Sequence, residues 1–358
     1  MDTILRRLCG CVILVCTIFS AGTIEAREGD DPGLLKIGAW LTYWDLPNGH
    51  HAMRAYENLF DVFYFAAQLT DKGEIAFANP KLTNILEARS TGNSNSRYWL
   101  TIVNDVSATT TGQTQLKDPH IVHSLLADSD KRTRHINDIV DLARLLGLRG
   151  IDIDYENLSI ADRGYFTEFS RELARALHRN KLLLSLSVQP KSKDVAWNGA
   201  GAMNWRELCE VTDRLQIMLY NQFSGKTGAG PIATPEWISS VLQYAETTCQ
   251  KNKIIPILKL SGIVWEGEQT RGIQFDEVNI LHNNTNAKSF RADVSNVPYI
   301  KYKENGKQFT AYYEDSISIL TKIKTIHALG YTNIMFWSLG REDPQLPIEL
   351  NRYLKTKK

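Results

Sequence analysis

Three acidic residues recur at every second position of an otherwise apolar segment. Asp152, Asp154 and Glu156 alternate with isoleucine and tyrosine, and alternate residues of an extended strand project from the same face. The leucine-rich flank at residues 145–148 favours burial of this strand over the alternative, a polar edge strand with one solvated face. Because interior carboxylates are costly unless they are paired or hydrogen-bonded, we expect the chain to use this row for chemistry.

The chemistry that such a row could perform is general acid–base catalysis. Stacked carboxylates cannot all ionise cheaply, so at least one proton is shared among them and the pKa values of the outermost groups are displaced. A glutamate that keeps its proton near neutral pH can serve as a general acid. Glu156, the last acid of the row, is therefore the candidate for that role.

The elements that must position this row alternate along the chain. Short apolar, β-rich runs are separated by segments of helical period, which fits a parallel (β/α)8 TIM barrel better than a doubly wound sheet. Strands buried on both faces also explain why the runs are nearly continuous in apolar residues. In such a barrel the acid row lies on strand four, with Glu156 at the C-terminal end, where barrel active sites occur. The runs are residues 37–43, 62–67, 99–103, 150–154, 182–188, 215–220, 254–260 and 333–337.

One connection, between strands seven and eight, is longer than a simple crossover. Residues 265–313 contain Asn305-Gly306 between two strand-like stretches, and Asn-Gly in that setting is a strong hairpin signal. The sequence therefore predicts a small α+β insertion. Since loops that follow barrel strands lie on the catalytic face, the insertion could wall one side of a cleft, or it could be mere decoration.

Composition limits the classes of partner. The chain has 358 residues and a formal net charge of +1, which suits one large α/β domain or two smaller ones and offers no electrostatic footprint for nucleic acid. Zinc-type spacings, a phosphate loop, a dinucleotide glycine pattern and a Gly-x-Ser-x-Gly elbow are all missing from the sequence. We therefore expect no nucleic-acid partner, no metal and no cofactor.

The N-terminus has the features of an export signal. Two arginines precede an apolar run, residues 8–19, which is followed by small residues, and this order is typical of a signal peptide. We predict a signal over residues 1–26, with cleavage near Ala21 or Ala26, and a secreted or periplasmic protein without a membrane span after cleavage. An uncleaved N-terminal anchor is the alternative, because the apolar run approaches spanning length.

The remainder of the chain, residues 27–358, keeps two cysteines, Cys209 and Cys249. Both are expected late in helices that precede neighbouring strands, which places them at the same end of the barrel. A disulfide between them is plausible in an oxidising compartment. Two buried free thiols are the alternative.

The acid row resembles the strand-four signature of glycoside hydrolase family 18, the chitinases and related endo-N-acetylglucosaminidases. That signature reads Asp-x-x-Asp-x-Asp-x-Glu, and residues 149–156 match its last three acids. Two further segments resemble the family in the same order: residues 218–221 (Met-Leu-Tyr-Asn) are similar to its Met-x-Tyr-Asp, and residues 334–338 to its strand-eight tryptophan segment. The resemblance extends from about residue 36 to residue 343.

The resemblance implies a role for each site residue. Glu156 would protonate the glycosidic oxygen, while the N-acetyl carbonyl of the substrate would attack the anomeric carbon, giving retention without an enzymic nucleophile. Asp154 would accept a hydrogen bond from the acetamido N–H, and Asp152 would pair with Asp154. Tyr220 would donate its hydroxyl to the acetamido oxygen.

The resemblance also implies substrate-binding residues. Trp337 would form an apolar floor beneath the sugar at the cleavage site, and Trp40, at the end of strand one, is a weaker candidate for the same pocket. Met218 and Asn221 belong to the strand-six motif. Core packing is the alternative for Trp337, Tyr220 and Trp40.

Two positions depart from the family pattern. Arg149 stands where the family has its first acid, and would either be buried beneath Asp152 or point outward. Asn221 replaces the aspartate after the tyrosine, and an amide cannot carry charge. Because spore-cortex and cell-wall members vary at such positions, the departures favour peptidoglycan or oligosaccharide processing over dedicated chitin digestion.

The sequence thus predicts a secreted glycosidase that cleaves next to N-acetylglucosamine in chitin-like, peptidoglycan or related glycans. A non-catalytic carbohydrate-binding protein on the same barrel is the alternative, because fold alone does not fix function. A metal-dependent hydrolase that uses the carboxylates as ligands is a third hypothesis. The sequence specifies no oligomeric state.

Overall fold

The computed structural model of the chain describes residues 35–57, 59–78, 96–107, 113–283 and 287–356. All elements given below belong to the compact unit Gly33–Lys358. The predicted signal peptide, residues 1–26, lies outside the described residues. None of the described helices combines the length and the apolar character needed to cross a bilayer.

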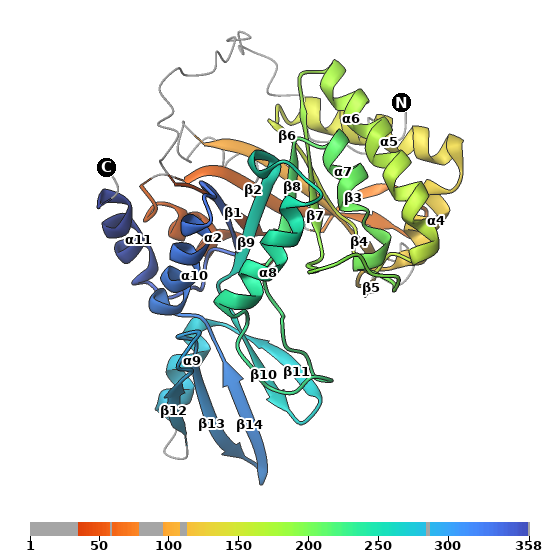
Figure 1. The fold of residues 1–358 in the computed structure, drawn as a ribbon. Helices are drawn as coiled ribbons and strands as arrows, with labels where there is room; N and C mark the ends of the chain where they lie inside the picture. The colour runs from red at the N-terminus through yellow and green to blue at the C-terminus, as the bar shows by residue number, and fades with distance from the viewer. Residues whose placement is uncertain (1–34, 58, 79–95, 108–112, 284–286, 357–358) are drawn as a thin grey trace. The chain divides into compact units, whose positions relative to one another are not determined.

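A closed barrel of eight parallel strands organises the fold (Figure 1). Each strand pairs with the next in the chain order given below, and β15 pairs with β1 through Lys36 and Asn333, which closes the ring. The predicted (β/α)8 barrel is therefore confirmed. Its strands are β1 (Lys36–Thr42), β2 (Leu59–Thr70), β4 (Arg97–Ser107), β6 (Gly150–Asp154), β7 (Leu183–Val188), β8 (Arg214–Met218), β9 (Ile254–Lys259) and β15 (Asn333–Trp337).

Helices connect most of these strands, and polar side chains fix where several of them begin. Asp128 accepts backbone N–H groups at the start of α5, Thr234 does so for α8, and Asp315 forms a capping box at α10. The α-helices are α2 (Leu46–Met53), α4 (Pro119–Leu126), α5 (Ser129–Leu145), α6 (Arg163–Arg179), α7 (Trp205–Val211), α8 (Pro235–Glu246), α10 (Ser316–Ala328) and α11 (Leu346–Lys355). Short 3-10 helices lie at Ile160–Asp162, Ala200–Ala202 and Lys251–Lys253. Two short strands, β3 (Ile75–Phe77) and β5 (Thr114–Gln115), pair antiparallel with β2 and β4.

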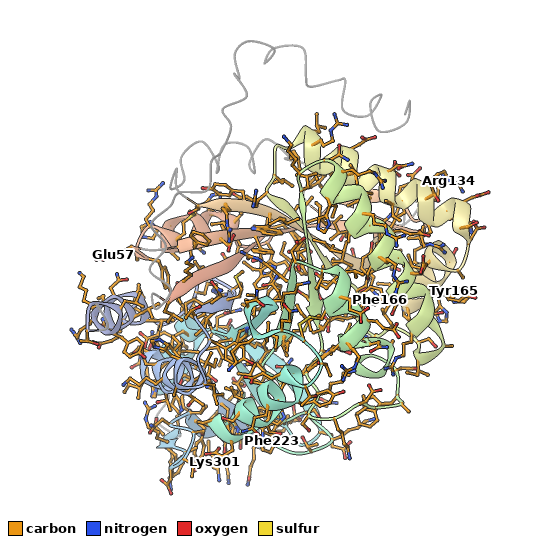
Figure 2. All side chains as sticks on the ribbon, turned by 45° about the horizontal axis from the view of Figure 1, so that its top comes forward. Glu57, Arg134, Tyr165, Phe166, Phe223 and Lys301 are labelled. Carbon is orange, nitrogen blue, oxygen red and sulfur yellow. A yellow bond between two sulfur atoms is a disulfide. The ribbon has the colours of Figure 1, made fainter. Side chains whose placement is uncertain are left out.

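Alternation along the strands separates two layers of core. The outward-facing residues of the strands pack against the helices. Phe166 of α6 is buried in this outer layer, whereas its neighbour Tyr165 is exposed (Figure 2). Gly150 begins β6 where a Cβ would lie 2.3 Å from the Leu183 carbonyl oxygen and 2.4 Å from the Trp99 ring, so only glycine allows this close approach. The inward residues form one cluster inside the barrel: Trp40, Phe63, Phe65, Trp99, Val103, Met218, Ile255, Ile257 and Met335.

The predicted insertion follows strand seven and forms a second, antiparallel sheet of five strands (Figure 1). The predicted hairpin is present, because β13 pairs with β14 around Asn305 and Gly306, whose φ angles of 50° and 77° suit a tight hairpin turn. The sheet order is β11-β10-β14-β13-β12. Its elements are β10 (Gly262–Glu266), β11 (Gln269–Ile273), α9 (Phe275–His282), β12 (Lys288–Arg291), β13 (Pro298–Glu304) and β14 (Lys307–Tyr312).

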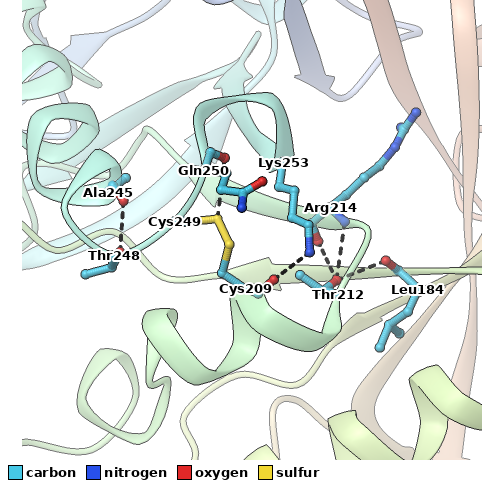
Figure 3. Close-up of a disulfide and its surroundings, with 9 residues drawn as sticks. All are labelled: Leu184, Cys209, Thr212, Arg214, Ala245, Thr248, Cys249, Gln250 and Lys253. Carbon is cyan, nitrogen blue, oxygen red and sulfur yellow. Dashed lines mark hydrogen bonds between the residues drawn. A yellow bond between two sulfur atoms is a disulfide. The ribbon is translucent and has the colours of Figure 1, made fainter.

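A disulfide joins Cys209 of α7 to Cys249, just after α8 (Figure 3). The two Cα atoms are 5.5 Å apart, and the Lys253 ammonium donates a 2.8 Å hydrogen bond to the Cys209 carbonyl beside the bridge. Of the two alternatives for these cysteines, the structure contains the disulfide. Because the bridge precedes β8 and β9 in the chain, it lies at the end of the barrel opposite the carboxyl ends of the strands.

Candidate active site

Glu156 stands at the mouth of the barrel, two residues beyond the end of β6. Its backbone is held by Asn104 of β4, which accepts a 2.8 Å hydrogen bond from the Glu156 N–H and donates one of 2.9 Å to the Glu156 carbonyl. Asn104 is completely buried. The amide side chain therefore fixes the direction in which the strand leaves the barrel and presents Glu156 to the mouth.

The Glu156 carboxylate has two partners. Lys117, in the segment before α4, forms an ion pair with Oε1, and Gln189 Nε2 donates to Oε2 at 3.3 Å. The glutamate side chain is 14 % exposed, so the carboxylate can be reached from the mouth. Lys117 is itself held in place, since its N–H donates a 2.9 Å hydrogen bond to Asp105.

Asp152 lies at the bottom of the row and is completely buried. Its oxygens accept hydrogen bonds from Thr101 at 3.1 Å, from Ser187 at 3.1 Å and from Gln216 at 3.2 Å. Burial raises the pKa of the Asp152 carboxyl, although these donors oppose the rise. The three donors come from β4, β7 and β8, so the strands around Asp152 hold it in one orientation.

Asp154 lies between the other two acids and is 9 % exposed. Burial raises its pKa well above the ordinary value of 3.8, and the charges of Glu156 and Asp152 raise it further. Among the described residues, no hydrogen-bond partner reaches its Oδ1. The fold therefore favours the protonated form of Asp154, and its buried Oδ1 has no partner among the described residues.

Tyr220 follows β8 and lies in the field of the same three acids. Burial raises the pKa of its hydroxyl well above 10.0, and the charges of Glu156, Asp154 and Asp152 act in the same direction. The hydroxyl therefore stays protonated at neutral pH and can act as a hydrogen-bond donor. Its ring packs against the aromatic cluster inside the barrel.

Trp337 ends β15 and is partly exposed at the mouth, as a sugar floor requires. Its ring packs edge-on against Phe65 at a centroid distance of 4.8 Å and against Trp40 at 5.9 Å. Trp40 and Met218 are only 2 % and 5 % exposed. These two therefore pack against the inner wall of the barrel, close to Trp337 and Tyr220.

Trp40 has a specific place in this support. Its indole N–H donates a 2.8 Å hydrogen bond to the Thr101 hydroxyl, which in turn donates to Asp152. The chain of hydrogen bonds links the aromatic floor to the deepest acid. Through these bonds Trp40 helps to hold Asp152 in place.

The two departures from the family pattern have different outcomes. Arg149 is exposed, so its charge does not lie beneath Asp152. Asn221 lies at the mouth with φ 58°, and its Oδ1 accepts a 3.4 Å hydrogen bond from the ammonium of Lys259. The second departure therefore changes the charge of the site, and the first does not.

Sequence reasoning missed the polar residues that surround the row. Their signal is a polar residue at an inward position of an otherwise apolar barrel strand, or just after the strand. In the part of the chain that the structure describes, no group of three or more His, Cys, Asp or Glu side chains is arranged to hold a metal. The missed residues are Thr101, Asn104, Lys117, Ser187, Gln189, Gln216 and Lys259.

Fold and site together define a TIM-barrel enzyme whose acids meet at the carboxyl end of strand four. The family model described as Glycosyl hydrolases family 18 matches residues 112–342. The chain belongs to this family of glycoside hydrolases, which confirms the family predicted from the acid row.

Curated relatives share part of their length with this chain. It is 27 % identical over 276 residues to the cortical fragment-lytic enzyme of Bacillus subtilis, an alignment that covers 74 % of this chain and 62 % of the relative. The putative sporulation-specific glycosylase YdhD of the same organism is 25 % identical over 226 residues, covering 61 % of this chain and 53 % of the relative. The chain thus spans less than two thirds of the relatives it matches.

Solved structures have the same fold. A chitinase from Chromobacterium violaceum superposes with a TM-score of 0.78 at 20 % identity, covering 89 % of this chain and 99 % of the other. The spore cortex-lytic enzyme SleL of Bacillus cereus superposes with a TM-score of 0.74 at 20 % identity, covering 90 % and 74 %.

Proposed function

We propose that the protein hydrolyses the glycosidic bond next to an N-acetylglucosamine unit by substrate-assisted retaining catalysis. The observation that carries the proposal is the position of Glu156 at the barrel mouth, beside Asp154 and within the same charged field as Tyr220. Relatives named as a cortical fragment-lytic enzyme and as chitinases support a substrate among peptidoglycan, chitin-like and related N-acetylated glycans.

The first step breaks the glycosidic bond. Glu156 gives its proton to the leaving oxygen, and the acetamido carbonyl oxygen of the substrate forms a bond to the anomeric carbon, so that an oxazolinium-type intermediate arises. In the second step Glu156 takes a proton from the water that opens this intermediate. The two inversions give net retention.

The neighbouring residues favour the attacking geometry of the acetamido group. The Asp154 carboxyl group accepts a hydrogen bond from the acetamido N–H, and a carboxylate there stabilises the positive charge that develops on nitrogen. The Tyr220 hydroxyl donates to the acetamido oxygen. Asp152 exchanges a proton with Asp154, and Trp337 lies under the apolar face of the pyranose.

The test is hydrolysis by Glu156→Gln of N-acetylated chitotetraose and of purified peptidoglycan strands. Loss of the general acid should lower the rate by about 10²–10⁴-fold, whereas the matched surface variant Glu210→Gln should retain it. NMR of the first product anomer checks retention. An unchanged rate in Glu156→Gln eliminates the mechanism.

A second candidate function is carbohydrate binding without turnover, and the ion pair between Lys117 and Glu156 favours it. The Lys117 ammonium occupies Oε1 of the carboxyl group that would have to deliver a proton to the leaving oxygen. Tight binding of chitotetraose by the wild-type protein, with no product after long incubation, would support this candidate over the glycosidase.

The proposal places the enzyme outside the cytoplasm. It combines the predicted export signal, residues 1–26, with the disulfide between Cys209 and Cys249, since disulfides persist in oxidising compartments. Cell fractionation with an antibody against the barrel checks this localisation. Detection in the membrane fraction with an intact N-terminus would favour the anchored alternative.

A further inference from the structure

Lys259 ends β9 with its side chain on the interior of the barrel. Ile255 and Ile257 of the same strand belong to the inward cluster, and Lys259 shares their face because alternate residues of a strand project the same way. In the parallel register, Lys259 is the direct partner of Trp337 on β15. The lysine thus stands at the mouth immediately beside the proposed sugar floor.

No acid balances this lysine. Within the described ranges, no carboxylate lies at ion-pair distance from its ammonium, whose hydrogen bond goes instead to the neutral amide oxygen of Asn221 at 3.4 Å. Glu314, the acid whose charge reaches Lys259, is itself bound to Lys322 at 2.6 Å. Burial, together with the charge of Lys117, lowers the pKa of Lys259 to about 8.

A cation in such a place is expensive unless an anion accompanies it. Removing an ammonium from water is unfavourable unless charge-assisted hydrogen bonds replace the lost hydration. Asn221 stands where the family resemblance leads us to expect an aspartate, so the chain lacks the counter-ion that this position would supply. An anionic group of a ligand can take that place.

We propose that Lys259 selects glycans that carry a carboxylate on or next to the sugar stacked on Trp337, so that acidic N-acetylated glycans bind in preference to neutral ones. This inference rests on the proposed function for the position of the sugar. The chemical class it points to is an N-acetylated hexosamine polymer with carboxylate-bearing ether substituents, as in unamidated muramic acid. Chitin, which is uncharged, is the disfavoured class.

The experiment compares binding in the Glu156→Gln background, where turnover does not interfere. The acidic probe is a peptide-free tetrasaccharide of alternating N-acetylglucosamine and N-acetylmuramic acid, and the neutral probe is N-acetylated chitotetraose. Isothermal titration calorimetry gives Kd for both. We expect the parent to bind the acidic probe more tightly and Lys259→Met to lower the acidic-to-neutral affinity ratio by about 10- to 100-fold, as for loss of a charged hydrogen bond.

Two further variants make the result specific. Asn221→Asp keeps Lys259 but supplies an internal counter-ion, so it should lower the same ratio. Lys253→Met removes a lysine at the opposite end of β9 and should leave the ratio unchanged.

The proposal is overturned if the acidic-to-neutral affinity ratio is close to one in Glu156→Gln. It is also overturned if neither Lys259→Met nor Asn221→Asp lowers that ratio. Failure of the proposed function looks different: the wild-type protein would release no product from either probe, whatever the affinity ratio.

Discussion

The ammonium of Lys117 forms an ion pair with Oε1 of Glu156, the carboxyl group from which the proposed mechanism requires a proton. Lys117 has a positive φ of 54°, and its N–H is bound to Asp105, so the backbone itself directs the side chain. The lysine side chain is 44 % exposed and the glutamate side chain 14 % exposed. The ion pair therefore lies at the mouth of the barrel, on the carboxyl group that the proposed first step uses.

Asp154 should make stability depend on pH in a defined direction. Because the fold raises the pKa of this acid, ionising it lowers the free energy of unfolding. This destabilisation is absent below the unfolded pKa of 3.8 and grows as pH rises through the folded pKa. Asp154→Asn removes the penalty, and each pKa unit of the shift corresponds to about 1.4 kcal/mol. The urea midpoint of the variant should therefore exceed that of the wild type by more at about pH 8 than at about pH 4.

The control for this prediction is an exposed acid. Asp141 of α5 is 64 % exposed, and Asp141→Asn should show the same stability difference from wild type at both pH values. Asp154→Asn should also lose hydrolytic activity, because an amide cannot carry the negative charge that the acetamido group requires. A variant that is stabilised equally at both pH values would show that Asp154 is ionised or protonated to the same extent across the range.

The Tyr220 hydroxyl should matter to turnover more than to binding. Its raised pKa keeps it protonated across the working range, and removal of one preorganised donor typically costs about 10²–10³-fold in kcat. Tyr220→Phe should therefore lower kcat by about that factor with a small change in KM and no shift of the pH profile. Wild-type kcat in Tyr220→Phe, together with a loss in Tyr220→Leu, would instead indicate that only the ring, which packs inside the barrel, is needed.

The barrel and its acid row could be predicted because both depend on local patterns. Strand-length apolar runs and carboxylates at alternate positions are readable from Asp152 to Glu156 without any tertiary information. The same alternation explains why Arg149 is exposed: it is an odd number of residues from the three acids and so projects from the other face.

The residues around the row could not be predicted, because their positions depend on register and on loops. Asn104 reaches Glu156 across two paired strands, and Lys117 reaches it from a loop. The position of Lys259 beside the site follows only from its pairing with Trp337. The local signal marks a polar residue in or after an apolar strand, but it does not say which partner the side chain meets, so the charge balance of the site required the fold.

The disulfide should stabilise the barrel without affecting the site. Cys209 and Cys249 enclose a loop with a sequence separation of 40, for which the chain-entropy model gives about 4 kcal/mol. The double variant Cys209→Ala/Cys249→Ala should lower the free energy of unfolding by about that amount in urea titrations, and dithiothreitol should reproduce the loss in the wild-type protein alone. Because the bridge precedes β8 and β9 while Tyr220 and Lys259 lie at their far ends, kcat and KM at moderate temperature should stay unchanged. A loss of activity in a folded double variant would mean that the start of these strands also controls the geometry of the mouth.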